Sequence, residues 1–230
     1  MEKKYISLWD KSAEENDYAG QIETTRDADV VVVGGGFTGL STAYHGAKLG
    51  LDIHVLEAKK IGYGGSGRNT GLVNAGLWLP PQDVNKKLGT ETGASLIETL
   101  GKMPEYVFSL IEKHQIQCEA TQNGTIHAAH SVAGLKNLEA RAQEWQRLGA
   151  PVELLTAKET EKKTGTKRFY GGLLDNRAGT INPMGYVRGL ARIALAAGAR
   201  ISTGIPVSYT HLRAHETPEH RVWRRVGEKK

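Results

Sequence analysis

One stretch decides the fold of this 230-residue chain: Asp29-Val30-Val31-Val32-Val33-Gly34-Gly35-Gly36-Phe37-Thr38-Gly39. Its four consecutive valines predict a buried parallel strand, because a strand that is covered on both faces is apolar throughout. Residues 40–50 predict a helix that ends at Gly50, and residues 52–57 predict a second strand. A strand, a glycine turn, a helix and a second strand within about thirty residues indicate a βαβ unit.

The three glycines Gly34, Gly36 and Gly39 have the spacing G-x-G-x-x-G of a dinucleotide-binding turn. The first permits the tight turn, the second lets a pyrophosphate approach the backbone, and the third lets helix and strand pack closely. The N–H groups around Phe37 and Thr38, at the positive end of the helix dipole, would face the phosphate. The motif predicts dinucleotide binding and leaves FAD and NAD both open.

Glu57 closes the second strand, 18 residues after Gly39. A carboxylate at this place accepts hydrogen bonds from the hydroxyls of a ribose. A 2′-phosphate would meet its negative charge there, so the sequence disfavours NADP.

A second glycine segment, Gly64-Gly65-Ser66-Gly67-Arg68-Asn69-Thr70-Gly71, follows where a simple dehydrogenase would form another helix. Its glycines allow the backbone to contact an extended ligand. Arg68 offers a guanidinium to a phosphate, and Ser66 and Asn69 offer polar groups. From these residues alone, a ligand-binding loop and a solvated surface loop both stay open.

The remaining sequence alternates between predicted helices and strands. Apolar residues recur at helical spacing over residues 96–111, where Pro104 should break or kink the helix. Thr156 and Glu159 have the spacing of a capping box at the start of a further helix. The other predicted elements are strands at 125–129, 152–155 and 200–207 and helices at about 135–148 and 183–197. This order predicts an α/β fold in which a second lobe is inserted into a nucleotide-binding layer.

The composition excludes several classes of protein. With 39% hydrophobic and 24% charged residues, the chain is not expected to be disordered. Its single cysteine, Cys118, forbids an internal disulfide and is interpreted as a buried, inert thiol. His127 and His130 have no acids or cysteines at ligand spacing, so no metal site is predicted. No leader-like segment or membrane-spanning run is present, and a cytoplasmic protein without a membrane partner is expected.

The net charge of +5 is concentrated in the tail. Residues 207–230 carry six Lys and Arg and three acids, so residues 1–206 hold 24 bases and 22 acids. The body of the chain shows no basic stripe with groove-reading or stacking elements, and no nucleic-acid partner is expected. Residues 207–217 resemble a translated sequencing adapter of the transposon-end type, which predicts a non-native tail at 207–230.

Residues 29–57 and 62–73 resemble the amino-terminal signature of the D-amino-acid oxidase-like superfamily of FAD-dependent amine and amino-acid oxidoreductases. A second flavin-contacting motif of that family reads G-x-G-A-S-G-R-N-G-G. This chain has G-Y-G-G-S-G-R-N-T-G over residues 62–71 and departs from the motif at Gly65 and Thr70. The resemblance covers about residues 29–206 and is greatest to the γ-glutamylputrescine oxidase-type members.

The resemblance implies FAD as the cofactor. The residues that would hold its ADP part are Gly34, Gly36, Phe37, Thr38, Gly39 and Glu57. Those that would lie along its pyrophosphate and isoalloxazine are Ser66, Arg68, Asn69 and Gly71. No histidine stands near Arg68, so the FAD is expected to be dissociable rather than covalently linked.

The resemblance also implies the reaction. A small-molecule amine or amino acid, with a γ-glutamyl polyamine favoured, loses a hydride to the flavin. The imine then hydrolyses, and oxygen reoxidises the flavin and yields peroxide. No residue of the chain is identified as a catalytic base.

The expected organisation is an amino-terminal arm at 1–28, a Rossmann-like FAD-binding domain at 29–118, a partial α+β substrate lobe at 119–181 and a return to the FAD-binding domain at 182–206. Members of the family are nearly twice as long, so we expect a fragment truncated at its carboxyl end and inactive alone. Its exposed sheet edge predicts poor solubility and weak retention of FAD. Two alternatives stay open, an NAD-dependent dehydrogenase and a non-catalytic nucleotide-binding subunit.

Overall fold

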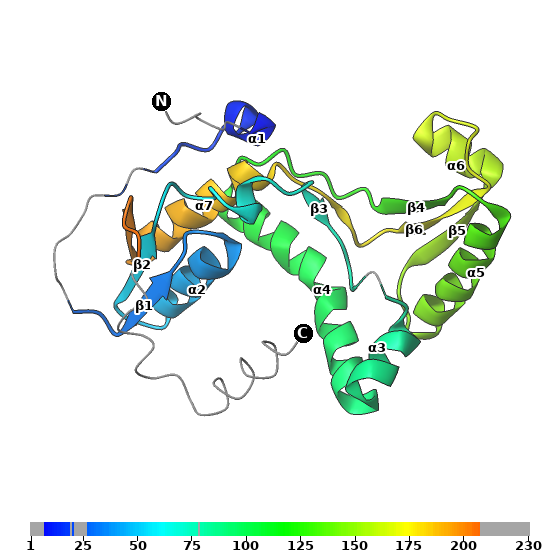
Figure 1. Cartoon of the computed structure of the whole chain (residues 1–230), viewed down its shortest axis with the longest axis horizontal. Helices are drawn as coiled ribbons and strands as arrows, with labels where there is room; N and C mark the ends of the chain where they lie inside the picture. Colours follow the sequence, from blue (N-terminus) through cyan, green and yellow to red (C-terminus); the bar gives the residue numbers. More distant parts are fainter. Residues whose placement is uncertain (1–6, 19, 21–26, 78, 208–230) are drawn as a thin grey trace, which may run out of the picture.

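The computed structural model describes residues 7–18, 20, 27–77 and 79–207, and the structural statements below concern these residues. The tail predicted at 207–230 therefore lies outside the described residues, except for Val207. Two groups of elements lie at opposite ends of the molecule, and the long helix α4 (Thr90–His114) runs between them (Figure 1).

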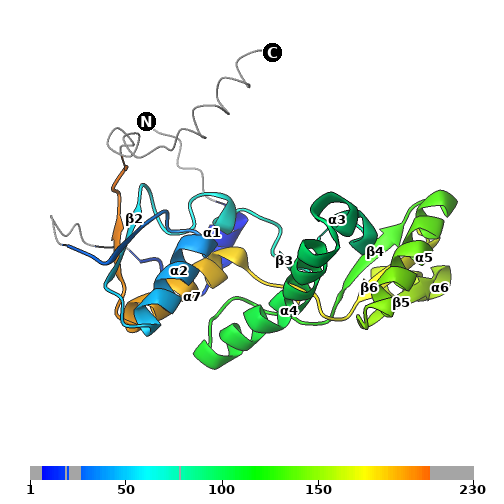
Figure 2. The same cartoon turned by 90° about the horizontal axis from the view of Figure 1, so that it is seen from below.

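The first group is the βαβ unit with a later strand added. Strands β1 (Val30–Val33), β2 (Ile53–Glu57) and β8 (Arg200–Thr203) form a parallel sheet in the order β1-β2-β8. Helices α2 (Phe37–Lys48) and α7 (Pro183–Ala196) pack together beside this sheet (Figure 2). The chain thus returns to its first sheet through α7 and β8, after the elements between β2 and α7.

The burial of β1 differs from its prediction. The strand is parallel to β2 as predicted, but Val31 is 55% exposed and Val33 is 48% exposed. β1 is an edge strand, and only its other face, with Val30 and Val32, packs on the core that α2 and α7 form. The expected burial on both faces is wrong, because no described element covers the second face of β1.

Helices α3 (Pro81–Leu88) and α4 lead out of this group, and α3 was not predicted. The sequence predicts a break or a kink at Pro104; Pro104 lies inside α4 and does not end it, so the break is wrong and the kink stays a prediction. The proline ring is fully buried, and the tertiary packing of the helix outweighs the loss of one helical hydrogen bond. The strands β3 (Leu72–Val73) and β7 (Gly179–Thr180) pair antiparallel between the two groups.

The second group is an antiparallel sheet with helices against it. Strands β4 (Thr125–Ala129), β5 (Val152–Thr156) and β6 (Gly171–Asp175) have the order β4-β6-β5. Helix α5 (Val132–Arg147) packs on all three strands, and α6 (Ala157–Thr164) packs on β5 and β6. The capping box of Thr156 and Glu159 is present as predicted. A separate small core includes Leu138, Trp145 and Leu173.

Two short helices complete the described fold. Helix α1 (Leu8–Ser12) belongs to the amino-terminal arm and packs on α7. The 3-10 helix η1 (Gly65–Gly67) lies in the second glycine segment and also contacts α7. Within the described ranges, no helix combines the length and the apolar character that crossing a bilayer requires.

Candidate cofactor site

The glycine turn between β1 and α2 has the geometry that its spacing predicts. Gly34 has φ +107°, a conformation that residues with a Cβ rarely adopt. A Cβ on Gly39 would lie 2.0 Å from the carbonyl oxygen of Gly34, so only glycine lets α2 approach the turn this closely. The backbone of the turn therefore depends on glycine at the first and third positions of the motif.

The amino terminus of α2 has no side-chain cap of its own, because Gly36 occupies the cap position. The hydroxyl of Ser66 supplies an acceptor instead and takes a hydrogen bond from the N–H of Phe37 at 3.0 Å. A Cβ on Gly36 would lie 2.8 Å from Ser66 Oγ, so the second glycine of the motif makes room for this hydroxyl. The two glycine segments meet at the start of α2.

Glu57 lies on the other side of the turn. Its carboxylate accepts hydrogen bonds from the N–H of Gly35 at 2.7 Å and from the N–H of Lys59 at 2.8 Å. The N–H of Gly62 donates to the carbonyl oxygen of Gly35 at 3.0 Å. The carboxylate is thus fixed beside the glycine turn, with lone pairs left to accept from a ligand hydroxyl.

The side chain of Asn69 shapes the second glycine segment from within. Its amide nitrogen donates to the carbonyl oxygens of Gly65 and Ser66 at 3.1 and 2.9 Å, and its amide oxygen accepts from the N–H of Gly71 at 2.8 Å. Gly71 has φ +75°, and a Cβ there would lie 2.1 Å from the carbonyl oxygen of Ile181. These two predicted cofactor residues hold the loop in shape.

The predicted residues are not all gathered at one place. The structure brings together Gly34, Gly36, Phe37, Glu57 and Ser66 around the turn. Arg68 is exposed, and its guanidinium lies 4.5 Å from the centre of the Tyr63 ring rather than at the turn.

The amino-terminal arm contacts the same loop, which the sequence did not predict. The indole N–H of Trp9 donates to the carbonyl oxygen of Asn69 at 2.9 Å, and the hydroxyl of Ser7 lies 3.4 Å from the carbonyl oxygen of Gly67. Ser7 and Asp10 form a capping box at the start of α1. Their spacing in the sequence was the signal that could have revealed this helix.

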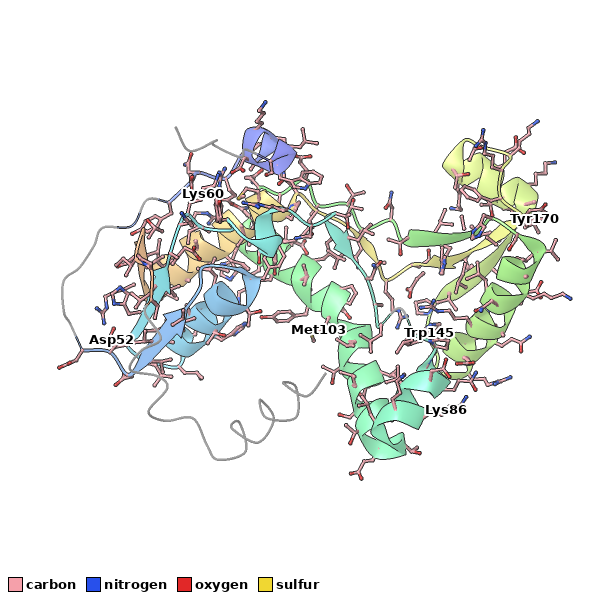
Figure 3. All side chains as sticks on the ribbon, in the orientation of Figure 1. Asp52, Lys60, Lys86, Met103, Trp145 and Tyr170 are labelled. Atoms are coloured by element: carbon pink, nitrogen blue, oxygen red, sulfur yellow. The ribbon has the colours of Figure 1, made fainter. Side chains whose placement is uncertain are left out.

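Ion pairs anchor the arm to α7. The buried Arg188 pairs with Asp10, which also pairs with Lys60 beside the loop (Figure 3). Arg192 forms a two-pronged pair with Glu15, with N–O distances of 2.7 and 3.0 Å. Burial acts to raise the pKa of Glu15, but hydrogen bonds from Arg192 and the N–H of Gln117 and the charge of Arg192 lower it overall. The arm, the loop and α7 therefore form one connected unit.

The residues around the turn fit the diphosphate and ribose of a dinucleotide. The start of α2 offers backbone N–H groups and the positive end of a helix dipole, with glycine in place of any obstructing side chain. The Ser66 hydroxyl accepts from Phe37 and retains its own hydrogen to donate. The Glu57 carboxylate accepts from the N–H of Gly35 within the turn, where a ribose would follow a diphosphate.

The chain is similar to known proteins over most of its length. The DAO family model, described as FAD dependent oxidoreductase, matches residues 29–228. The Gamma-glutamylputrescine oxidoreductase of Escherichia coli (strain K12) is 35% identical over 174 residues, which are 75% of this chain and 41% of that protein. The crystal structure of glycine oxidase from Geobacillus kaustophilus has a TM-score of 0.65 at 22% identity, over 78% of this chain and 47% of that chain.

A further solved structure contains the cofactor. The dithionite-reduced L-alpha-glycerophosphate oxidase from Mycoplasma pneumoniae with FAD bound has a TM-score of 0.64 at 19% identity, over 80% of this chain and 46% of that chain.

The chain belongs to the DAO family of FAD dependent oxidoreductases, whose model covers residues 29–228. The family decides for FAD and against the NAD alternative that the sequence left open. The chain spans about two fifths (41%) of the length of the E. coli relative. The family match runs past residue 207 into the segment expected to be non-native, and the structure does not describe residues 208–230.

Proposed function

We propose that the complete protein is an FAD-dependent oxidase of a γ-glutamyl derivative of an amine, with oxygen as the electron acceptor. When bound, FAD would supply the two-electron oxidation of the amine to an imine, which water hydrolyses, and the two electrons and two protons would leave on oxygen as peroxide. The similarity to Gamma-glutamylputrescine oxidoreductase supports the substrate class.

The hydrogen bond between Ser66 and Phe37 carries this proposal. FAD is an extended molecule, so its diphosphate needs contacts from the first glycine turn and its flavin half needs a second segment. Ser66 joins these two segments at the amino terminus of α2, where an anion is best stabilised.

Each predicted residue has a role in the proposed site. The turn glycines and the N–H of Thr38 bind the diphosphate, Ser66, held by the N–H of Phe37, donates to it, and Glu57 accepts from the ribose. Asn69 and Gly71 hold the loop shape that presents Ser66, and Arg68 stacks on the ring of Tyr63. The ordering of these groups before the ligand arrives reduces the entropy lost on binding.

The connectivity supports the proposed division of the chain. β8 joins the sheet of β1 and β2, as a return to the FAD-binding domain at 182–206 requires. The antiparallel sheet β4-β6-β5 lies within 119–181 and has its own core, as a partial substrate lobe requires.

The cofactor proposal is tested by titrating FAD into the chain and recording the fluorescence anisotropy of the flavin. We expect weak binding, competition by ADP and no competition by a nucleotide that carries a 2′-phosphate. Glu57→Gln should weaken both FAD and ADP, whereas Glu98→Gln, at an exposed position on α4, should change neither. FAD binding that ADP does not displace would contradict the assignment of this turn to the diphosphate.

The reaction is tested with the complete protein, in which the native sequence continues beyond residue 206. The complete protein should release peroxide when a γ-glutamyl amine is added under air. Flavin reduction without peroxide would support the proposed substrate and would contradict oxygen as the electron acceptor. No reduction by any amine or amino acid would favour a non-catalytic nucleotide-binding subunit.

A further inference from the structure

A cavity of about 270 Å³ lies in the second group of elements, apart from the glycine turn. Its wall consists of residues 74–77, which follow β3, together with side chains of the β4-β6-β5 sheet and of α5. Its volume is close to the lower end for pockets that bind small organic ligands, which is roughly 300 Å³. A ligand in this cavity would contact both residues 74–77 and the β4-β6-β5 sheet.

The cavity wall carries the guanidinium of Arg141 and the carboxylate of Asp175, and Arg177 stands beside it as the ion-pair partner of Asp175. The Nη2 of Arg141 donates to the carbonyl oxygen of Leu77 at 3.1 Å, which fixes the guanidinium at the wall. Arg177 holds the carboxylate of Asp175 through Nε at 3.0 Å and Nη2 at 2.7 Å. Burial, and then the charge of Arg141, lower the pKa of His127 below its usual value near 6.5, so this imidazole is neutral at pH 7.

The rest of the wall is largely apolar. Val152 and Leu173 are buried side chains of the sheet that face α5. The indole of Trp145 on α5 lies beside the residues that follow β3 (Figure 3). Gly76 has φ +89°, and a Cβ there would lie 2.9 Å from Trp145 Cη2, so glycine lets the segment pass beside the indole. The Arg141 guanidinium and the Asp175 carboxylate, which keeps lone pairs beyond its pair with Arg177, lie beside this apolar surface and match an amino-acid group that continues into a methylene chain.

The cavity lies a short distance along the chain from the proposed cofactor loop. The strand β3 separates Gly71, the last residue of the loop, from Asn74 in the cavity wall. Three extended residues span about 10 Å. A γ-glutamyl diamine carries its amino-acid group at one end and its oxidisable amine at the other. A pocket displaced from the proposed cofactor loop therefore suits the amino-acid end of the substrate, which does not react.

We propose that this cavity binds the amino-acid end of the substrate, with the carboxylate directed to Arg141 and the ammonium to Asp175. The methylene chain lies against Val152 and Leu173. This inference rests on the proposed function for its substrate class, and it assigns Arg141 and Asp175 to specificity rather than to the chemical step.

The test uses two probes that lack the terminal amine of a γ-glutamyl diamine. γ-Glutamylethylamide carries the amino-acid group, and N-ethylbutanamide has the same amide chain without its two charges. Each is titrated into the 230-residue chain by isothermal calorimetry without FAD, so a failure of the cofactor proposal does not affect the result. We expect γ-glutamylethylamide to bind at least ten-fold more tightly than N-ethylbutanamide. Equal affinities, or no heat from γ-glutamylethylamide up to about 10 mM, would overturn the proposal.

Variants then assign the binding to this cavity. Arg141→Gln and Asp175→Asn should each weaken γ-glutamylethylamide at least ten-fold, and Arg141→Lys should retain part of the affinity because it keeps the charge. Lys158→Gln, on the exposed surface of α6, is the control that should change nothing. The circular dichroism spectrum of each variant checks its fold. Full affinity in a folded Arg141→Gln chain would overturn the proposal, and the probe comparison in the unaltered chain decides the matter where a variant does not fold.

Discussion

The hydroxyl of Ser66 accepts a hydrogen bond from the backbone N–H of Phe37 across 29 residues of sequence. This contact joins the second glycine segment to the amino terminus of α2. A helix amino terminus is a favourable position for an anion. Ser66 supplies a side-chain acceptor to the first N–H of α2, whose own cap residue, Gly36, has no side chain. Its hydroxyl thus links the loop to the helix and keeps a donor available for a phosphate.

Removing this hydroxyl should weaken both functions of the contact. Ser66→Ala leaves the N–H of Phe37 without its acceptor and removes a donor to the proposed diphosphate. A lost hydrogen bond of about 1 kcal/mol predicts an FAD affinity about five-fold lower, measured by flavin anisotropy. Thr70→Ala, at an exposed position of the same loop, is the control. Equal losses in both variants would show that the loop tolerates neither change and that Ser66 has no special part.

Trp9 should restrain the cofactor loop from the arm. Trp9→Phe keeps an aromatic ring and removes the indole N–H that donates to Asn69. We expect the backbone amides of residues 65–71 to exchange with deuterium roughly two- to ten-fold faster, as the loss of about 0.5–1.5 kcal/mol predicts. Leu8→Ala, at a side chain that is 71% exposed, should leave this exchange unchanged. Unchanged exchange in Trp9→Phe would show that the arm does not restrain the loop.

The pair of Glu15 and Arg192 should make stability depend on acid. The pKa of Glu15 lies below its usual 4.5, because the hydrogen bonds from Arg192 and Gln117 and the charge of Arg192 outweigh the effect of burial. Its contribution is therefore complete above pH 4.5 and is lost as the pH falls through the lowered value. Urea unfolding between pH 7 and 3 should show a shallower decline for Glu15→Gln than for the parent chain.

The neighbouring Glu14 provides the control for this experiment, because its side chain is exposed. Glu14→Gln should follow the parent chain at every pH. A Glu15→Gln chain whose stability declined as steeply as the parent would assign the acid sensitivity to other carboxylates.

Cys118 should be inert in the folded chain. Burial, and then the carboxylates of Glu15 and Glu119, raise the pKa of its thiol to about 12. The reactive thiolate is therefore almost absent at pH 8. A chromogenic disulfide reagent should release less than a tenth of its signal from the native chain and a full equivalent after unfolding in urea. Rapid labelling without urea would contradict the burial of this thiol.

Local signals explain why part of the site could be predicted from the sequence. The valine strand, the glycine spacing and Glu57 lie within thirty residues and define their own geometry. The capping box at Thr156 is equally local, and the structure has it. The pairing of Asp10 with Arg188 spans 178 residues, and no pattern in either segment indicates the other.

Other positions depend on tertiary surroundings that a sequence pattern does not contain. Pro104 stays inside α4 because the helix is packed around it. Asn69 has the polarity of a ligand-binding residue, yet its amide makes three hydrogen bonds within its own loop. The four valines of β1 predict a buried strand, and the described residues cover one face of it only.

The uncovered face of β1 should cause the chain to self-associate. Val31 and Val33 lie on the edge strand of a parallel sheet, where exposed apolar side chains and unpaired backbone groups favour strand addition. Val31→Thr combined with Val33→Thr keeps the β-branched shape and adds two hydroxyls, so the strand should persist. Sedimentation velocity should show a larger monomer fraction for this double variant than for the parent chain. Leu49→Ala removes an 81% exposed apolar side chain beyond the end of α2 and should not shift the distribution. If it did so equally, the association would follow from general exposure of apolar surface and not from the edge of the sheet.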